Sequence, residues 1–109
     1  CVKFAEEQAE KFGVRAPMVG HMGDGNFHVI LPFDPQNKES YKKIRSFNDT
    51  LIKKSLELNG TITGEHGVGL HKKEYLLEQH PDSIPVMKSI KRTLDPNNIM
   101  NPGKIFDLN

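Results

Sequence analysis

The chain has 109 residues, a formal net charge of +1 and 27% charged residues of both signs. This length suits one domain with a modest core, and the mixed charge lacks the clustered basic surface of a nucleic-acid binder. Cys1 is the only cysteine, which excludes an internal disulfide framework and a thiolate-based zinc finger. A single cysteine fits a reducing, intracellular setting. No apolar run approaches the roughly 20 residues of a membrane helix, so a soluble protein is expected.

The first element is an amphipathic helix. In residues 1–12 apolar side chains recur at three- and four-residue spacing, charged side chains cover the other side, and Gly13 supplies a stop signal. Because the chain begins with Cys1, inside this pattern, we expect it to be the end of a longer protein or an excised piece.

A glycine-rich turn then separates two β-rich runs. The second run, residues 27–33, reads Phe-His-Val-Ile-Leu-Pro-Phe, which favours an antiparallel hairpin with Asp24-Gly25 as its turn. Counting outward from that turn makes His21 and His28 cross-strand partners. Opposed Cβ atoms lie about 4.5–5.5 Å apart, so both rings are predicted to reach one metal ion, while the other face packs on a helix.

The longest predicted helix spans residues 36–58, with Asp34 as its cap and Pro35 in its first turn. Asn59-Gly60 ends it, and residues 61–63 read as a short β-branched strand. Strand, helix and strand form a βαβ crossover, which predicts an α+β fold with an incomplete sheet. The edges of such a sheet need a partner domain or chain.

Two further helices are predicted towards the C-terminus. A short one covers residues 70–77, and Pro81 breaks it. The last begins after an Asp82 cap and tolerates Pro85 in its first turn. Its apolar stripe contains Val86, Met87, Ile90 and Leu94.

Glu65 and His66 follow the predicted third strand, at the kind of strand end where sites commonly form. If the backbone stays extended, adjacent side chains point to opposite faces, so Glu65 becomes a third metal ligand and His66 a separate acid/base group. Two histidines and a carboxylate with open positions form a catalytic rather than a structural zinc set. The alternative is that His21 and His28 are only structural residues of a turn.

Several neighbouring residues have simpler interpretations. Asp24 is interpreted as a turn residue. Asn26 is either the left-handed residue of the turn or an amide directed at a substrate carboxylate, and the sequence leaves both open. Lys72 and Lys73 are interpreted as an exposed charged face. The glycines of residues 64–69 do not follow a phosphate-loop order.

Three motifs carry a resemblance to a known family: His-Met-Gly-Asp-Gly-Asn-Phe-His (21–28), Gly-Glu-His-Gly-Val-Gly-Leu-His-Lys-Lys (64–73) and Leu-Asp-Pro-Asn-Asn-Ile-Met-Asn-Pro-Gly-Lys (94–104). The chain resembles the C-terminal part of the FAD-linked oxidases of the vanillyl-alcohol oxidase type. It is most similar to the group of glycolate oxidase FAD-linked subunits, D-lactate dehydrogenases and D-2-hydroxyglutarate dehydrogenases. The resemblance implies that residues 1–109 are the substrate and metal part of a ferredoxin-like cap domain, followed by C-terminal helices, without the FAD-binding domain.

The resemblance also implies roles for individual residues: His21, His28 and Glu65 as ligands of a divalent metal, usually zinc, Asn26 as a substrate contact, His66 as the base, and Asn101 as a residue near the flavin. The implied reaction oxidises a D-2-hydroxy acid to the 2-oxo acid with hydride transfer to FAD. The implied partners are that substrate, the missing FAD-binding domain and an electron-acceptor protein or quinone. The expected location is cytoplasmic, with membrane association through partners, and the chain alone is expected to be inactive.

Two other functions compete with this one. The first is a stand-alone metal-binding or interaction module whose open sheet edge docks a partner. The second is a metal hydrolase that activates water on the ion, for which Asp24 is the local carboxylate candidate.

Overall fold

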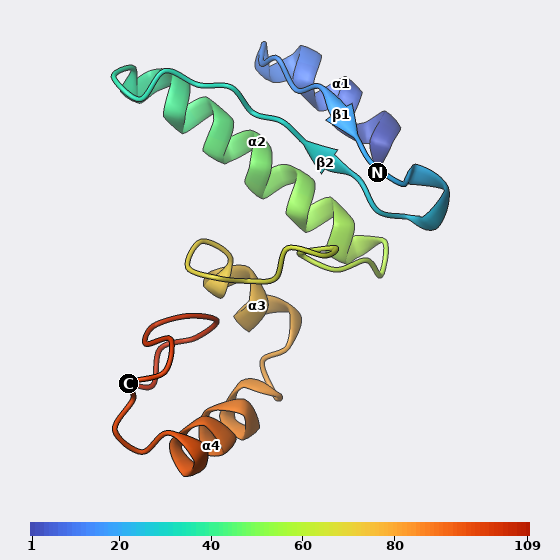
Figure 1. The fold of residues 1–109 in the computed structure, drawn as a ribbon. Helices are drawn as coiled ribbons and strands as arrows, with labels where there is room; N and C mark the ends of the chain where they lie inside the picture. Colours follow the sequence, from blue (N-terminus) through green and yellow to red (C-terminus); the bar gives the residue numbers. More distant parts are fainter. The chain divides into compact units, whose positions relative to one another are not determined.

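A computed structural model describes residues 1–109, which divide into two compact units, residues 1–60 and 61–109 (Figure 1). The first unit contains α1 (Val2–Phe12), β1 (Met18–Val19), a 3-10 helix (Met22–Asp24), β2 (His28–Val29) and α2 (Lys38–Glu57). The second contains α3 (Lys73–Gln79) and α4 (Ile84–Leu94). Helices combined with one antiparallel sheet confirm the predicted α+β class.

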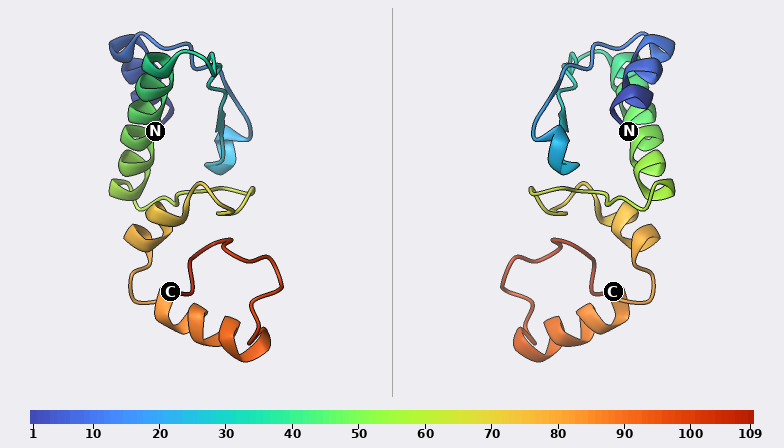
Figure 2. Two further views of the ribbon diagram at one scale, coloured as in Figure 1. Left: turned by 90° about the vertical axis from the view of Figure 1, so that its left-hand side faces the viewer. Right: turned by 90° about the vertical axis from the view of Figure 1, so that its right-hand side faces the viewer.

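The core of the first unit lies between α1 and α2, which run side by side (Figures 1 and 2). Ala5 of α1 is buried, and Phe47 of α2 has no exposed surface. The ring of Phe12 meets that of Phe47 edge-on, with 6.2 Å between centroids. The predicted end of the first helix is confirmed, because Gly13 adopts a left-handed φ of 63° and its N–H donates to the last turn.

Helix α2 begins later than predicted. The side chain of Asn37 accepts hydrogen bonds from the N–H groups of Glu39 and Ser40, at 3.1 and 3.0 Å, so Asn37 is the N-cap. The predicted cap, Asp34, instead accepts from the N–H of Gln36 at 2.9 Å and forms a local turn. The predicted C-terminal signal is confirmed by Asn59, whose φ of 58° ends the helix.

The predicted hairpin exists, but its predicted register is wrong. The strands β1 and β2 pair as Met18 with Val29 and Val19 with His28, so His21 does not oppose His28. The reason is the turn between them. Residues 22–24 wind into a 3-10 helix, which takes residues 20–27 out of the ladder and lengthens the loop.

The third strand predicted at residues 61–63 is absent, and with it the βαβ crossover. In this segment, side chains form hydrogen bonds with the backbone N–H and carbonyl groups that would otherwise pair with a neighbouring strand. The N–H of Ile62 donates to Gln79 Oε1 at 3.2 Å, and its carbonyl accepts from Lys72 Nζ at 3.1 Å. The N–H of Thr63 donates to the hydroxyl of Thr61 at 3.2 Å. These local and side-chain bonds satisfy the segment without a partner strand.

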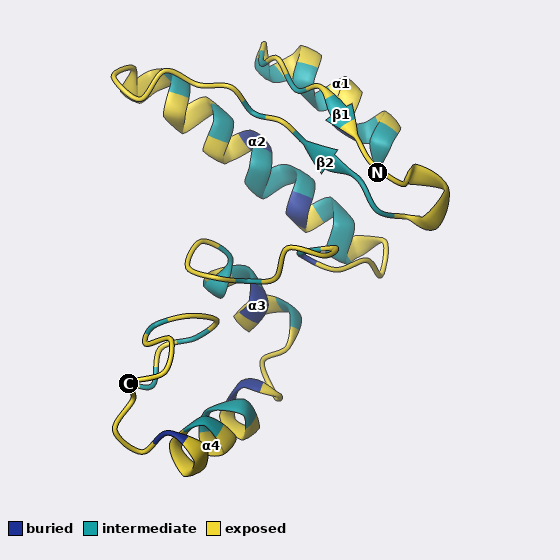
Figure 3. Cartoon of the chain, in the orientation of Figure 1, coloured by how far each residue is buried: buried dark blue, intermediate teal, exposed yellow.

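The second unit is built from short helices, and few of its residues are buried (Figure 3). Helix α3 begins at Lys73 rather than 70, because Gly67 and Gly69 adopt positive φ and hold the preceding chain in a loop. Helix α4 begins after Ser83 rather than Asp82, with the predicted proline in its first turn. Most of the predicted apolar stripe is uncovered: Val86, Ile90 and Leu94 are 60%, 55% and 76% exposed, and Met87 is half-buried. The buried residue of α4 is Ile84, outside that stripe. None of the helices combines the length and the apolar character needed to cross a membrane.

Candidate metal and substrate site

The hairpin loop contributes His21, Asn26 and His28, and backbone hydrogen bonds hold its shape. The carbonyl of His21 accepts from the N–H groups of Asp24 and Asn26, at 2.9 and 3.2 Å. Gly25 takes the left-handed conformation with φ 78°. The His21 side chain is exposed, whereas Asn26 and His28 are half-buried. The loop therefore presents both imidazoles from a defined backbone.

Asn26 does not occupy the left-handed position of the turn. The non-glycine residues with positive φ lie elsewhere in the chain, and Gly25 supplies that conformation here. Of the two interpretations of Asn26, the purely conformational one is therefore excluded. Its amide remains a candidate for contact with a substrate carboxylate.

Gly20 allows the two sides of the loop to approach closely. A Cβ at Gly20 would lie 2.9 Å from Phe27 Cα and 3.3 Å from His28 Cδ2, and its φ of 138° also disfavours a side chain. The approach brings the backbone of one segment against the His28 ring. A glycine is required at this position because neighbouring backbone, rather than a flexible side chain, fills the space.

In the second unit Glu65 and His66 face each other. His66 Nε2 lies 3.7 Å from Glu65 Oε1, so the prediction that these side chains point to opposite faces is wrong. The alternation required an extended strand, and this segment bends instead. Both side chains are more than half exposed, at 73% and 54%, so the pair itself adds little stability. It does place a carboxylate beside an imidazole.

Lys72 and Gln79 hold the segment that leads to Glu65. Together they bond both backbone polar groups of Ile62, which is itself 5% exposed. Lys72 is half-buried, and this burial lowers the pKa of its ammonium group. The prediction that Lys72 is simply exposed is therefore wrong, because its ammonium group turns to the carbonyl of Ile62, a contact that the sequence pattern does not show. Lys73 is also half-buried, so the same prediction is wrong for it, and it pairs with the exposed carboxylate of Asp107 at 2.8 Å.

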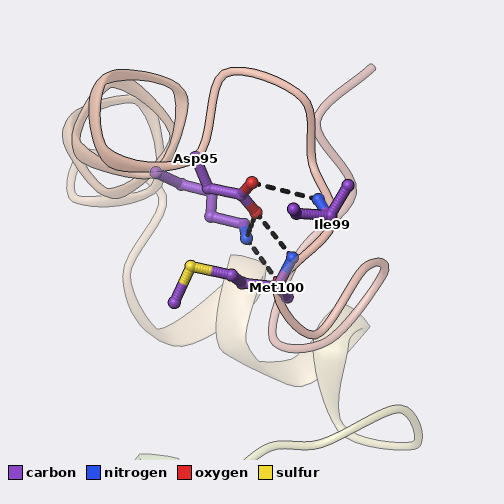
Figure 4. A network of polar contacts seen from close by, with 4 residues as sticks. Asp95, Ile99 and Met100 are labelled. Carbon is purple, nitrogen blue, oxygen red and sulfur yellow. Dashed lines mark hydrogen bonds and ion pairs between the residues drawn. The ribbon is translucent and has the colours of Figure 1, made fainter.

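The C-terminal tail contains Asn101, which is exposed and has a φ of 47°. The tail is tied to the loop after His66 by a hydrogen bond from the N–H of Ile105 to the carbonyl of Gly69, at 2.8 Å. Just before the tail, the carboxylate of Asp95 accepts the N–H groups of Ile99 and Met100 (Figure 4). No sequence pattern predicted this contact, because Asp-Pro only signals a helix end.

The sequence of the chain matches a described family over almost its whole length. Residues 1–105 match the family of FAD linked oxidases, C-terminal domain. The chain belongs to this family. The resemblance found in the three motifs is thereby confirmed.

Three relatives illustrate the family. The "Probable D-lactate dehydrogenase, mitochondrial" of Danio rerio is 45% identical over 96 residues, covering 87% of this chain and 19% of the relative. The glycolate oxidase subunit GlcD of Bacillus subtilis is 41% identical over 106 residues, 96% of this chain and 23% of the relative. The D-2-hydroxyglutarate dehydrogenase of Stutzerimonas stutzeri is 46% identical over 90 residues, 80% and 19% respectively. The chain thus spans about a fifth of the length of these relatives.

Proposed function

We propose that this chain is the C-terminal part of an FAD-dependent dehydrogenase that oxidises a D-2-hydroxy acid of the glycolate or D-lactate type to the 2-oxo acid. The single observation that carries the proposal is the family match over residues 1–105. The names of the relatives support the substrate class, because they specify D-lactate, glycolate and D-2-hydroxyglutarate. We place the hairpin in a ferredoxin-like cap whose remaining strands come from the rest of the polypeptide.

The donor set of the chain suits a divalent metal. We assign His21, His28 and Glu65 as ligands, because two imidazoles and a carboxylate match the open, catalytic type of zinc site. His21 and Glu65 are exposed, so both donor groups are open to solvent. When bound, a zinc ion would supply Lewis-acid polarisation of the hydroxyl and carboxylate oxygens of the substrate.

We assign the proton transfer to His66. Its imidazole would accept the hydroxyl proton as the C2 hydrogen leaves with its electron pair, so that the C–O single bond becomes a carbonyl. Glu65 Oε1 lies 3.7 Å from His66 Nε2, so the proposed metal ligand and the proposed base are neighbours. Asn26 would orient the substrate by donating its amide N–H to the carboxylate. FAD, bound mainly by the rest of the protein, would accept the hydride, and we place Asn101 beside it.

The partners in this proposal are the small hydroxy acid, the FAD-binding part of the polypeptide and an electron-acceptor protein or quinone. The location we propose is cytoplasmic, with membrane association through those partners. The absence of a membrane-crossing helix among α1–α4 is compatible with it.

Flavin reduction in the full-length polypeptide tests the proposal. We expect D-lactate or glycolate to bleach the flavin absorption of the unmodified protein in stopped flow, and His66→Ala to retain FAD but lose reduction by at least about a hundredfold. His80→Ala is the matched control, because His80 is also an exposed histidine of the second unit. Full reduction in the His66→Ala protein would remove His66 from the role of base. No reduction of the unmodified protein by any D-2-hydroxy acid would overturn the substrate class.

A further inference from the structure

Asp95 is the one charged residue of the chain that is buried, with 5% of its surface exposed. It follows the last residue of α4, where the helix dipole is negative and a carboxylate is unfavourable. Helix stability alone does not explain an aspartate at this position. Its carboxylate also contacts the tail that follows the helix.

The carboxylate of Asp95 binds two consecutive backbone amides of that tail. Oδ1 accepts from the N–H of Ile99 at 3.0 Å, and Oδ2 accepts from the N–H of Met100 at 2.9 Å. The ammonium of Lys91, one helical turn earlier, donates to Oδ2 of Asp95. Figure 4 shows the carboxylate directed at both amides. Charge-assisted bonds of this kind are stronger than neutral ones.

Lys91 adds a second contact to the same peptide. Its ammonium also donates to the carbonyl of Met100. Both backbone polar groups of Met100 are therefore bound at the C-terminal end of α4, the N–H by the Asp95 carboxylate and the carbonyl by the Lys91 ammonium. The next residue in the chain is Asn101.

The backbone around Met100 turns sharply and gains little from apolar packing. Asn98 and Asn101 have φ values of 51° and 47°, in the left-handed region, which asparagine adopts more readily than most residues with a side chain. The side chains of Ile99 and Met100 are 76% and 61% exposed, so apolar burial does not hold them. Asp95 and Lys91 instead supply the hydrogen bonds that fix the backbone immediately before Asn101.

We infer that Asp95 is a positioning residue, which with Lys91 as its counter-ion fixes the backbone of Met100 and thereby sets how Asn101 is presented to the flavin. The anchoring of Met100 stands on the hydrogen bonds alone, whereas the flavin-facing role of Asn101 rests on the proposed function. The two parts are separable by experiment.

The test uses Asp95→Asn in the full-length polypeptide, with amide hydrogen exchange and the flavin absorption spectrum as readouts. The asparagine amide has the size of the carboxylate but no charge. Its NH2 group would also face other hydrogen-bond donors, namely the Lys91 ammonium and the backbone N–H groups. We expect exchange at residues 99–101 to accelerate at least about tenfold, as loss of a charge-assisted hydrogen bond implies, and the flavin spectrum to shift. Asp82→Asn, which removes an exposed carboxylate of the same unit, should change neither.

Unchanged exchange at residues 99–101 in Asp95→Asn would overturn the inference, and so would an equal acceleration throughout α3 and α4. If Asp95→Asn does not fold, Lys91→Gln preserves the carboxylate and removes the ammonium from Met100, and the same local acceleration is expected. Asn101→Ala separates the two parts: it should shift the flavin spectrum while exchange at Met100 stays unchanged. An unshifted spectrum in Asn101→Ala would overturn the flavin role of Asn101, and exchange in Asp95→Asn would still decide the anchor.

Discussion

The two loops that carry the candidate ligands are held in different ways. In the hairpin loop the carbonyl of His21 and the close approach at Gly20 define the geometry, so the backbone itself supports His28. In the loop that carries Glu65 and His66, the support comes from side chains of another element, because Lys72 and Gln79 bind Ile62. The first loop should therefore tolerate side-chain changes at most positions, whereas the second should depend on residues distant in sequence.

The largest expected effect is on metal binding by the hairpin loop. Replacing both of its histidines, as His21→Ala/His28→Ala, should weaken zinc binding to the chain by at least about a hundredfold in calorimetry, because even indirect partners of ligands contribute 10- to 100-fold. The matched control is His71→Ala/His80→Ala, which removes the same number of histidines, both of them exposed. Equal zinc affinities for the ligand variant and the unmodified chain would show that the ligand assignment is wrong.

Gly20 tests the backbone support directly. Gly20→Ala should destabilise the chain by about 2 kcal/mol in urea unfolding, because strained φ and a Cβ against backbone add together. Gly23→Ala is the control: a Cβ there meets nothing within 4 Å. Equal stabilities of the two variants would refute a role for the close approach at Gly20.

Gln79 tests the side-chain support of the second loop. Gln79→Ala leaves the N–H of Ile62 without its partner, which should cost about 1 kcal/mol and accelerate amide exchange in residues 61–66. Glu78→Ala changes the exposed neighbour on the same helix and should leave both quantities unaltered. If exchange in residues 61–66 does not respond to Gln79→Ala, the loop is held by other contacts.

The smallest expected effect is the contribution of Asp95 to the pH dependence of folding stability. The hydrogen bond from Lys91 is the main cause that lowers the pKa of Asp95 to about 2, with help from the amides of Ile99 and Met100 and against the effect of burial. Because the folded pKa is depressed, the stabilisation is complete above the unfolded value of about 3.9 and is lost as the pH falls towards 2. In Asp95→Asn the melting temperature should depend less steeply on pH between about pH 4 and pH 2. In Asp82→Asn that dependence should be unchanged.

Much of the fold could be predicted because helix signals are local. Gly13 ends α1 and Pro85 lies in the first turn of α4, each as its position in the pattern predicts. The hairpin was also predicted, since a glycine-rich turn between β-rich runs is a short-range signal. The predicted register is wrong, because a two-residue Asp24-Gly25 turn would place His21 opposite His28, whereas the structure forms a 3-10 helix over Met22–Asp24.

The sequence predicted which residues could act as ligands or base, but it did not predict how their side chains are arranged. Two histidines beside a turn and a Glu-His pair are visible in the sequence because metal ligation depends on the donor atoms. The facing arrangement of Glu65 and His66 was missed, since it follows from a bend rather than from strand alternation. The buried carboxylate of Asp95 was missed for a similar reason, because its amide partners come from a tail without periodicity.

By itself the sequence determined the positions of the helices, the family and the chemical identity of the candidate ligands, because periodicity, caps and motifs are properties of neighbouring residues. The tertiary structure decided the pairing of β1 with β2, the replacement of a third strand by side-chain bonds to Ile62, and the burial of Asp95. Each of these depends on which donors reach which acceptors in space. Residues 17 positions apart, such as Ile62 and Gln79, share a hydrogen bond only after the chain has folded.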